Sequence, residues 1–195
     1  MVVMMIVICV FCVMFFNRAP DRTIPDRGIV SPASGRVIDI RKTDRADIIF
    51  DKKGTSNHVT LPEIEGPVWV IAIEMTPLDV HVQRAPIAGS IIRMDHYDGR
   101  HANALGREKL GLVNENEKTI TIFNHDADAV GVVQVAGMAA RRIRNTSQVG
   151  DTVAKGDQYG RIMVGSQVVV IIPAAYDPLV NIGNRVVDGE TVLAQ

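Results

Sequence analysis

Two short patterns that each occur twice constrain the fold of this 195-residue chain more than any other feature. Residues 31–38 resemble residues 85–92, and in both a Pro-x-x-Gly segment turns the chain into an apolar stretch. Residues 149–157 resemble residues 182–190, and both contain the tight-turn pattern Gly-x-x-Val-x-x-Gly. Two copies of both patterns predict a mainly β fold, a pseudo-symmetric β-sandwich built from two half-barrels. The alternative is chance similarity among glycine-rich turns, because the chain has 16 glycines.

Composition also favours strands. Val and Ile are abundant, whereas Phe, Trp and Tyr together make up 5% of the chain. Branched side chains suit a pleated sheet, and 195 residues suffice for one well-buried domain. One helix is predicted around residues 103–110. Strands are predicted at residues 68–73, 81–84, 91–94, 119–124, 131–135 and 161–172.

Charge and cysteine content exclude several classes of function. The net charge of −1 provides no general attraction to nucleic acid, so no nucleic-acid partner is expected. Cys9 and Cys12 both lie near the N-terminus, which leaves the rest of the chain without a disulfide framework. His96 and His101 flank a short polar segment that has no cysteine nearby. We therefore expect no metal site there.

The N-terminal segment is predicted to be a membrane anchor. Residues 1–16 carry no charge and would span roughly 24 Å as a helix. A cleaved secretory signal is the alternative, but it needs a basic leader and a small-residue cleavage site. Arg18, Arg22 and Arg27 follow the apolar run, so positive-inside bias predicts a cell-membrane location with the main domain on the cytoplasmic side. We expect an N-terminal transmembrane helix within residues 1–17, followed by a β domain over residues 18–195.

A Gly-Ser pair, Gly165 and Ser166, interrupts the long apolar run of residues 161–173. Glycine inside a strand pattern marks a bulge or a close backbone approach. A serine at such a bend could attack its own preceding carbonyl carbon and cleave the chain. The alternative is that Gly-Ser is a common dipeptide without chemical meaning.

Asp79 and His81 form a second candidate pair. Two residues apart on a strand, their side chains would share one face. A carboxylate beside an imidazole can orient the ring and favour its charged form. The alternative is a surface ion pair on an edge strand.

Taken in order, five stretches resemble the phosphatidylserine decarboxylase family, in particular its short archaeal and bacterial form, which includes archaetidylserine decarboxylases. The resemblance covers nearly the whole chain, and the order and spacing of the stretches are more specific than any one of them. They are Phe-Phe-Asn-Arg at 15–18 leading to Ile-Pro at 24–25; Ser-Pro-Ala-Ser-Gly-Arg-Val at 31–37; residues 76–89 with Asp-Val-His-Val-Gln-Arg-Ala-Pro; Gln-Val-Ala-Gly at 134–137 leading to Arg-Arg; and Tyr-Gly-Arg at 159–161 leading to Gly-Ser and Pro173.

This resemblance implies a lyase made as a zymogen. Ser166 would attack the Gly165 carbonyl, and autocatalytic cleavage would separate residues 1–165 from residues 166–195. Ser166 would become a covalent pyruvoyl group, the cofactor that accepts electrons when a serine phospholipid loses CO2 to give an ethanolamine phospholipid. The family's histidine falls on His81, which would act as the base. The resemblance implies that the protein binds the membrane serine phospholipid and the lipid bilayer, and that the two fragments bind each other. The oligomeric state stays open, as does the lipid core, which could be a diacyl lipid or an archaeal ether lipid.

One position departs from the family pattern. The family motif is Ser-Pro-Ala-Asp-Gly, and its Asp forms a triad with the histidine and the cleaved serine, but this chain has Ser34 there. The resemblance therefore leaves two alternatives, an active decarboxylase or an uncleaved lipid-binding pseudoenzyme. A third hypothesis, outside the family, is a β-sandwich module of an envelope assembly. Asp79 is one substitute for the missing carboxylate. If Ser34 is the defect, Ser34→Asp is expected to speed cleavage.

Overall fold

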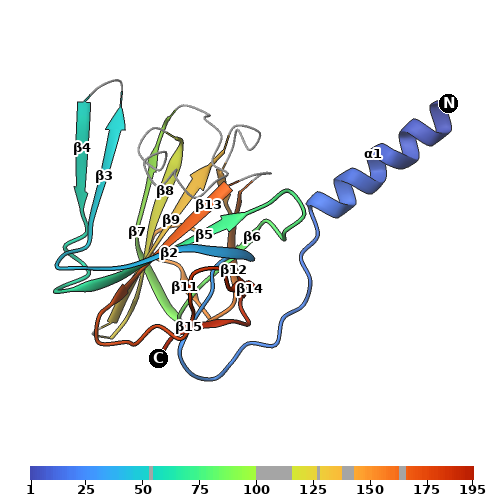
Figure 1. The fold of residues 1–195 in the computed structure, drawn as a ribbon. Coiled ribbons are helices and arrows are strands. Elements are labelled where there is room, and N and C mark those ends of the chain that lie inside the picture. Colours follow the sequence, from blue (N-terminus) through green and yellow to red (C-terminus); the bar gives the residue numbers. More distant parts are fainter. Residues whose placement is uncertain (53–54, 100–115, 127, 138–142, 163–165) are drawn as a thin grey trace.

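The computed structural model describes the chain except for residues 53–54, 100–115, 127, 138–142 and 163–165 (Figure 1). The described part is mainly β, which confirms the predicted fold class; the helix predicted around 103–110 lies outside the described residues. Its elements are α1 (Val2–Phe16), β1 (Ile29–Val30), β2 (Gly35–Thr43), β3 (Asp47–Lys52), β4 (Thr55–Thr60), β5 (Val68–Met75), β6 (Val82–Arg84), β7 (Gly89–Tyr97), β8 (Lys118–His125), β9 (Asp128–Ala136), β10 (Ile143–Asn145), β11 (Thr152–Val153), β12 (Gln158–Ile162), β13 (Ser166–Pro173), β14 (Arg185–Val186) and β15 (Val192–Ala194).

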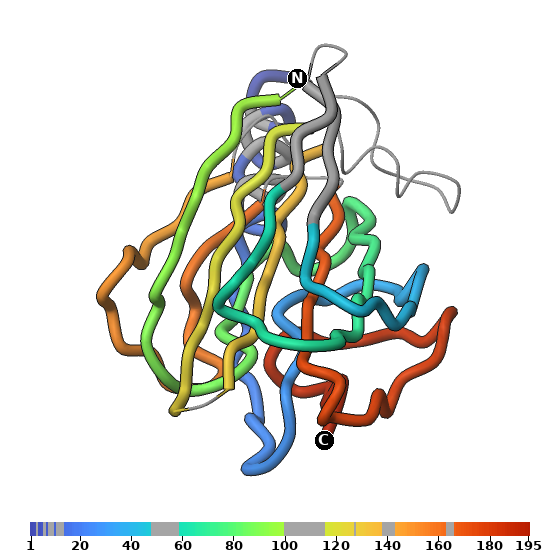
Figure 2. The backbone as a smooth tube through the Cα atoms, turned by 90° about the vertical axis from the view of Figure 1, so that its left-hand side faces the viewer, coloured from blue at the N-terminus to red at the C-terminus, as the bar shows by residue number. Residues whose placement is uncertain are grey.

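An eight-stranded antiparallel sheet forms the centre of the β domain, in the order β11-β7-β8-β9-β13-β5-β2-β14. Its long strands run side by side as a curved half-barrel (Figure 2). β13 lies near the middle, paired with β9 on one side and β5 on the other. Val168 and Val170 pack into one apolar cluster, whereas Val169 and Ile171 pack into another on the opposite face. Since full burial of one such side chain contributes about 1.5–3 kcal/mol, β13 anchors the sheet from both faces.

The predicted internal symmetry is present in the strand pairing. In the first copy, β14 pairs with the start of β2, so that Val186 lies opposite Gly35. In the second copy, β11 pairs with the start of β7, so that Val153 lies opposite Gly89. The two copies form the two edges of the large sheet. A Cβ at Gly35 would lie 2.2 Å from the Glu74 carbonyl oxygen, and one at Gly89 would lie 2.0 Å from that of Asn124, so both glycines are required for close backbone contact.

A smaller sheet, β10-β12-β6, carries the strand that leads toward Ser166. The sequence predicted one interrupted strand over residues 161–172. This is wrong, because β12 ends at Ile162 in the three-stranded sheet and β13 begins at Ser166 in the eight-stranded sheet. The chain therefore passes from one sheet to the other around the predicted cleavage position. Two further pairs, β1-β15 and the β3-β4 hairpin, complete the fold, and the hairpin projects from the large sheet (Figure 1).

Helix α1 projects from the β domain, and the polar connector after it runs along one side of that domain (Figure 1). The expected N-terminal transmembrane helix is not supported: α1 has 15 residues, and no helix in the described part of the chain is long and apolar enough to cross a bilayer. Its residues are nevertheless apolar throughout, and several project into solvent, including Met4, Met5 and Val10.

Candidate functional site

Ser166 is the first residue of β13, where it lies opposite Met75 on β5 and Ala136 on β9. Its side chain is fully buried. The hydroxyl donates a hydrogen bond to the Met75 thioether Sδ at 3.4 Å. Because sulfur is a weak acceptor, this contact orients the hydroxyl without holding it strongly. Gly165, the predicted cleavage partner, lies outside the described residues.

His81 immediately precedes β6 and is only 2% exposed. Its backbone carbonyl accepts a hydrogen bond from the Ile162 N–H at 3.1 Å, so His81 is held beside the last residue of β12. Neither ring nitrogen has a hydrogen-bond partner in the described part of the chain. Buried polar atoms are normally paired. Both ring nitrogens of His81 are unpaired, and its backbone is bonded to Ile162, four residues before Ser166, so the imidazole is available to exchange a proton near the start of β13.

A chain of buried polar side chains links the strand that follows His81 to Ser166. Gln83 on β6 donates to the same Met75 Sδ at 3.6 Å, and Gln134 on β9 donates to the Gln83 amide oxygen at 3.2 Å. Met75 thus contacts both Gln83 and Ser166. Sequence reasoning missed Met75 and Gln134. Gln83 could have been found, because it lies two residues after His81 and so shares its position in the strand alternation.

The environment of His81 favours its neutral form. Burial lowers the pKa of His81 below the usual 6.5, and the positive charges of Arg18 and Arg161 lower it further. The backbone carbonyl and the charge of Asp79 oppose this shift, although the carbonyl does not reach hydrogen-bond geometry with either ring nitrogen. Near neutral pH the ring is therefore an unprotonated base.

Asp79 lies in a turn rather than on a strand, so the prediction that it shares a strand face with His81 is wrong. Its carboxylate accepts hydrogen bonds from the Thr76 N–H and hydroxyl, both at 2.7 Å. Its other oxygen pairs with Arg185 at 2.6 Å. Asp79 therefore shapes the loop that carries His81 and contributes its charge to the ring, while its carboxylate is occupied elsewhere.

Ser34 belongs to a separate buried cluster built around Asp188. The Ser34 hydroxyl donates to the Asp188 carboxylate at 2.5 Å and accepts from the Asp188 N–H at 3.1 Å. Asp188 is fully buried and also pairs with Arg22 at 2.6 Å and with Arg84 at 2.8 Å. The Ser34 and Ser166 hydroxyls thus have different described partners, Asp188 and Met75, and β5 lies between β13 and β2 in the large sheet.

Sequence reasoning missed Asp188, although a signal was present. In the alignment of residues 182–190 with residues 149–157, Asp188 occupies the place of Lys155. The charge at that position is thus reversed between two otherwise similar turns. Since Asp188 faces two arginines across more than 100 residues of sequence, the reversal marks a tertiary ion pair rather than a surface variation.

The Ser34–Asp188 contact changes the expected result for Ser34→Asp. Aspartate at position 34 would place two carboxylates in contact, and like charges at that distance share a proton. We expect the single variant to be destabilised by about 1–3 kcal/mol, the typical cost of a badly paired buried polar group. The exchange variant Ser34→Asp/Asp188→Ser should recover most of that loss, as measured by urea unfolding. Equal stability of wild type and Ser34→Asp would contradict the prediction.

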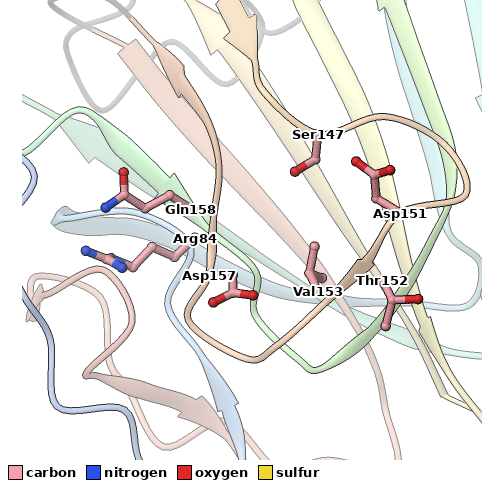
Figure 3. Close-up of a pocket in the computed structure, with 7 residues that line it drawn as sticks. All are labelled: Arg84, Ser147, Asp151, Thr152, Val153, Asp157 and Gln158. Atoms are coloured by element: carbon pink, nitrogen blue, oxygen red, sulfur yellow. The ribbon is translucent and has the colours of Figure 1, made fainter.

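A groove of about 560 Å³ is lined by neither His81 nor Ser166 (Figure 3). Its carboxylates stabilise turns: Asp151 accepts from the Gln148 N–H and Asp157 from the Ala154 N–H. The groove therefore has no described nucleophile–base pair. Its lining residues are Arg84, Ser147, Asp151, Thr152, Val153, Asp157 and Gln158.

Comparison with known proteins gives a consistent result. The sequence pattern of the family described as phosphatidylserine decarboxylase matches residues 10–194. A protein named "Putative archaetidylserine decarboxylase proenzyme" from Methanocaldococcus jannaschii is 38% identical over 185 residues, covering 92% of this chain and 87% of the relative. One of the same name from Methanothermobacter thermautotrophicus is 36% identical, covering 99% and 84%. A phosphatidylserine decarboxylase proenzyme from Mycobacterium bovis is 37% identical, covering 94% and 74%.

Proposed function

Because the chain belongs to the phosphatidylserine decarboxylase family, a family of carboxy-lyases made as proenzymes, we propose that it cleaves itself at Ser166 and then decarboxylates a serine phospholipid. The observation that carries this proposal is His81: a buried imidazole with two unpaired ring nitrogens, tied through its backbone to the strand that leads to Ser166. Archaetidylserine and phosphatidylserine share the serine head group on which such chemistry acts, so the proposal covers both lipid types.

In this proposal the residues have distinct roles. Neutral His81 takes the proton of the Ser166 hydroxyl, which then attacks the preceding carbonyl carbon. The weak contact to Met75 allows the hydroxyl to leave its resting position. A pyruvoyl group formed from Ser166 would supply an electron acceptor for loss of CO2. Its surroundings fit: Ser166 is fully buried, and His81 lies close to the strand before it as a proton carrier.

The two fragments are expected to remain together after cleavage. Residues 166–195 include β13, which is inserted between β9 and β5 in the large sheet. They also include Asp188, whose partners Ser34, Arg22 and Arg84 all belong to residues 1–165. Central strand pairing and a buried ion cluster thus join the fragments. We propose an N-terminal segment of residues 1–17, which contains α1, and a β domain over residues 18–195.

We place the protein at the cell membrane, with the β domain on the cytoplasmic side and α1 against the bilayer. Helix α1 is apolar throughout and its solvent-facing side chains have no described protein partner. Leu78, on the loop that carries His81, is 73% exposed close to the C-terminal end of α1, where Arg18 donates to its carbonyl. Exposed apolar side chains at one end of the molecule favour contact with lipid.

Intact mass measurement under denaturing conditions tests the proposal. The expected result is two species that correspond to residues 1–165 and to residues 166–195 with a blocked N-terminus, together with CO2 release from vesicles that contain serine phospholipid. A matched Ser166→Ala protein should remain a single chain and release no CO2. A wild-type chain that stays intact over long incubation yet binds those vesicles would instead assign the pseudoenzyme, and two species without CO2 release would reject the substrate.

A further inference from the structure

Two arginines lie beside His81, at the junction of α1 and the β domain. Arg18 donates to the carbonyl oxygens of Phe15, at 2.7 Å, and Leu78. Its guanidinium carbon also lies 3.9 Å from the centre of the Phe15 ring. Arg161, on β12, donates to the Phe16 carbonyl at 3.2 Å and to the backbone oxygen of Asn17 at 3.1 Å. Arg161 lies opposite Val82, the residue after His81, in the pairing of β12 with β6, and the positive charges of both arginines lower the pKa of His81.

These two arginines differ from the others around the site in having no described carboxylate partner. Arg22 and Arg84 pair with Asp188, and Arg185 pairs with Asp79. All described acceptors of Arg18 and Arg161 are neutral oxygens. Arg18 binds the Phe15 carbonyl and Arg161 the Phe16 carbonyl, so both positive charges lie at the end of α1. A negatively charged ligand at this position would offset the repulsion between them.

Both guanidinium groups still have donors to offer. Arginine has five N–H donors. Two are used in the described bonds of Arg18 and three in those of Arg161, so each side chain keeps at least two. Partial burial also lowers the pKa of Arg161, consistent with a cation removed from water before its ligand arrives. Arginine forks match the oxygens of a phosphate group.

We propose that Arg18 and Arg161 bind the phosphodiester of the lipid whose serine head group is decarboxylated. This inference rests on the function proposed above. In such a lipid, only an oxygen and a methylene separate the phosphorus atom from the serine α-carbon. A phosphate held beside His81 therefore brings the α-carbon into the neighbourhood of His81 and Ser166, while the acyl or isoprenoid chains extend along α1.

The contacts of Arg22 show which of the basic residues after α1 is available for a phosphate ligand. From sequence, Arg18, Arg22 and Arg27 are equivalent basic residues after an apolar run. In the structure the guanidinium of Arg22 is committed to buried Asp188, whereas Arg27 is exposed and has no described ion pair. Only Arg18 of the three joins Arg161 beside His81, so the lipid site uses one connector arginine and one from β12.

A purely structural role is the alternative, because the two arginines also hold the last carbonyls of α1. The variants Arg18→Gln and Arg161→Gln distinguish a structural role from phosphate binding. Arg27→Gln is the control, because it also removes one positive charge. With glycerophosphoserine as a soluble substrate, we expect each variant to raise KM at least tenfold with a smaller change in kcat, and Arg27→Gln to leave KM unchanged. Self-cleavage, followed by intact mass, reports whether each variant has folded.

Chemical modification of the wild-type protein gives a second measurement that needs no variant. Phenylglyoxal labels accessible arginines, and peptide mapping reads each site separately. Glycerophosphoserine should protect Arg18 and Arg161 but not Arg27, while free serine should protect neither. Equal labelling with and without glycerophosphoserine would overturn the proposal. Equal protection by inorganic phosphate would reassign the site to free phosphate and overturn the lipid assignment.

The same measurements distinguish failure of this inference from failure of the proposed function. Protection of Arg18 and Arg161 in a protein that neither cleaves nor releases CO2 would retain the phosphodiester site and reject the decarboxylase. Cleavage and CO2 release with unchanged KM in both variants would retain the decarboxylase and reject the arginine site.

Discussion

Replacing His81 with glutamine is expected to slow self-cleavage by about 10²–10⁴-fold, the usual contribution of a positioned general base. Glutamine keeps much of the side-chain volume and can form hydrogen bonds, but it cannot take a proton. His81 is buried, neither of its ring nitrogens has a described hydrogen-bond partner, and its lowered pKa favours the neutral ring. No other described side chain beside β12 is therefore equally suited to deprotonate Ser166. Accumulation of the two fragments after refolding from denaturant, followed by intact mass, measures the rate.

The pH profile gives this prediction a second readout. Burial and two arginines lower the pKa of His81, so the neutral base is populated at lower pH than for a free imidazole. The cleavage rate of the wild type should therefore rise with pH through a midpoint below 6.5 and then level off. In His81→Gln this midpoint should disappear. His125→Gln, at an exposed histidine, is the control that should keep it. An unchanged midpoint in His81→Gln would assign the base to another group.

Replacing Asp188 with asparagine is expected to reduce the free energy of unfolding by about 3–5 kcal/mol, the usual effect of removing one partner from a buried ion pair. Asparagine is nearly the same size, so the loss comes from charge. The side chains of Arg84 and Arg22 are 8% and 13% exposed, and without Asp188 both guanidinium groups remain in a largely dry site. The Ser34 hydroxyl can then donate only to a neutral amide oxygen in place of a carboxylate.

Urea unfolding of an uncleaved Ser166→Ala background measures this effect without the complication of two fragments. Asp177→Asn is a matched control, because Asp177 is exposed and its described contacts are made by its backbone. In the cleaved protein the same substitution should also weaken fragment association, because Asp188 and its arginines lie on different fragments. A loss below about 1 kcal/mol would mean that the arginines find water or other acceptors, as exposed pairs do.

Several features of the molecule were predictable because they depend on residues close in sequence. The Pro-x-x-Gly and Gly-x-x-Val-x-x-Gly patterns each encode a turn, and their duplication predicted an internal symmetry, which the structure shows in the pairing of β14 with β2 and of β11 with β7. Gly35 and Gly89 belong to the Pro-x-x-Gly pattern, and the structure explains why glycine is needed there: the close backbone contact leaves no room for a side chain. Motif order singled out Ser166 and His81 as candidate site residues, although the sequence wrongly joined β12 and β13 into one strand.

The sequence by itself determined the β class, the duplicated turns and the candidate residues for chemistry, since backbone preferences and side-chain types are local properties. Only the tertiary structure decided the partners of those residues: Met75 for Ser166, Asp188 for Ser34, and the end of α1 for Arg161. Each of these contacts joins segments more than 90 residues apart. Such contacts arise when sheets pack and apolar surface is buried, and no local pattern specifies which distant side chain fills a given space.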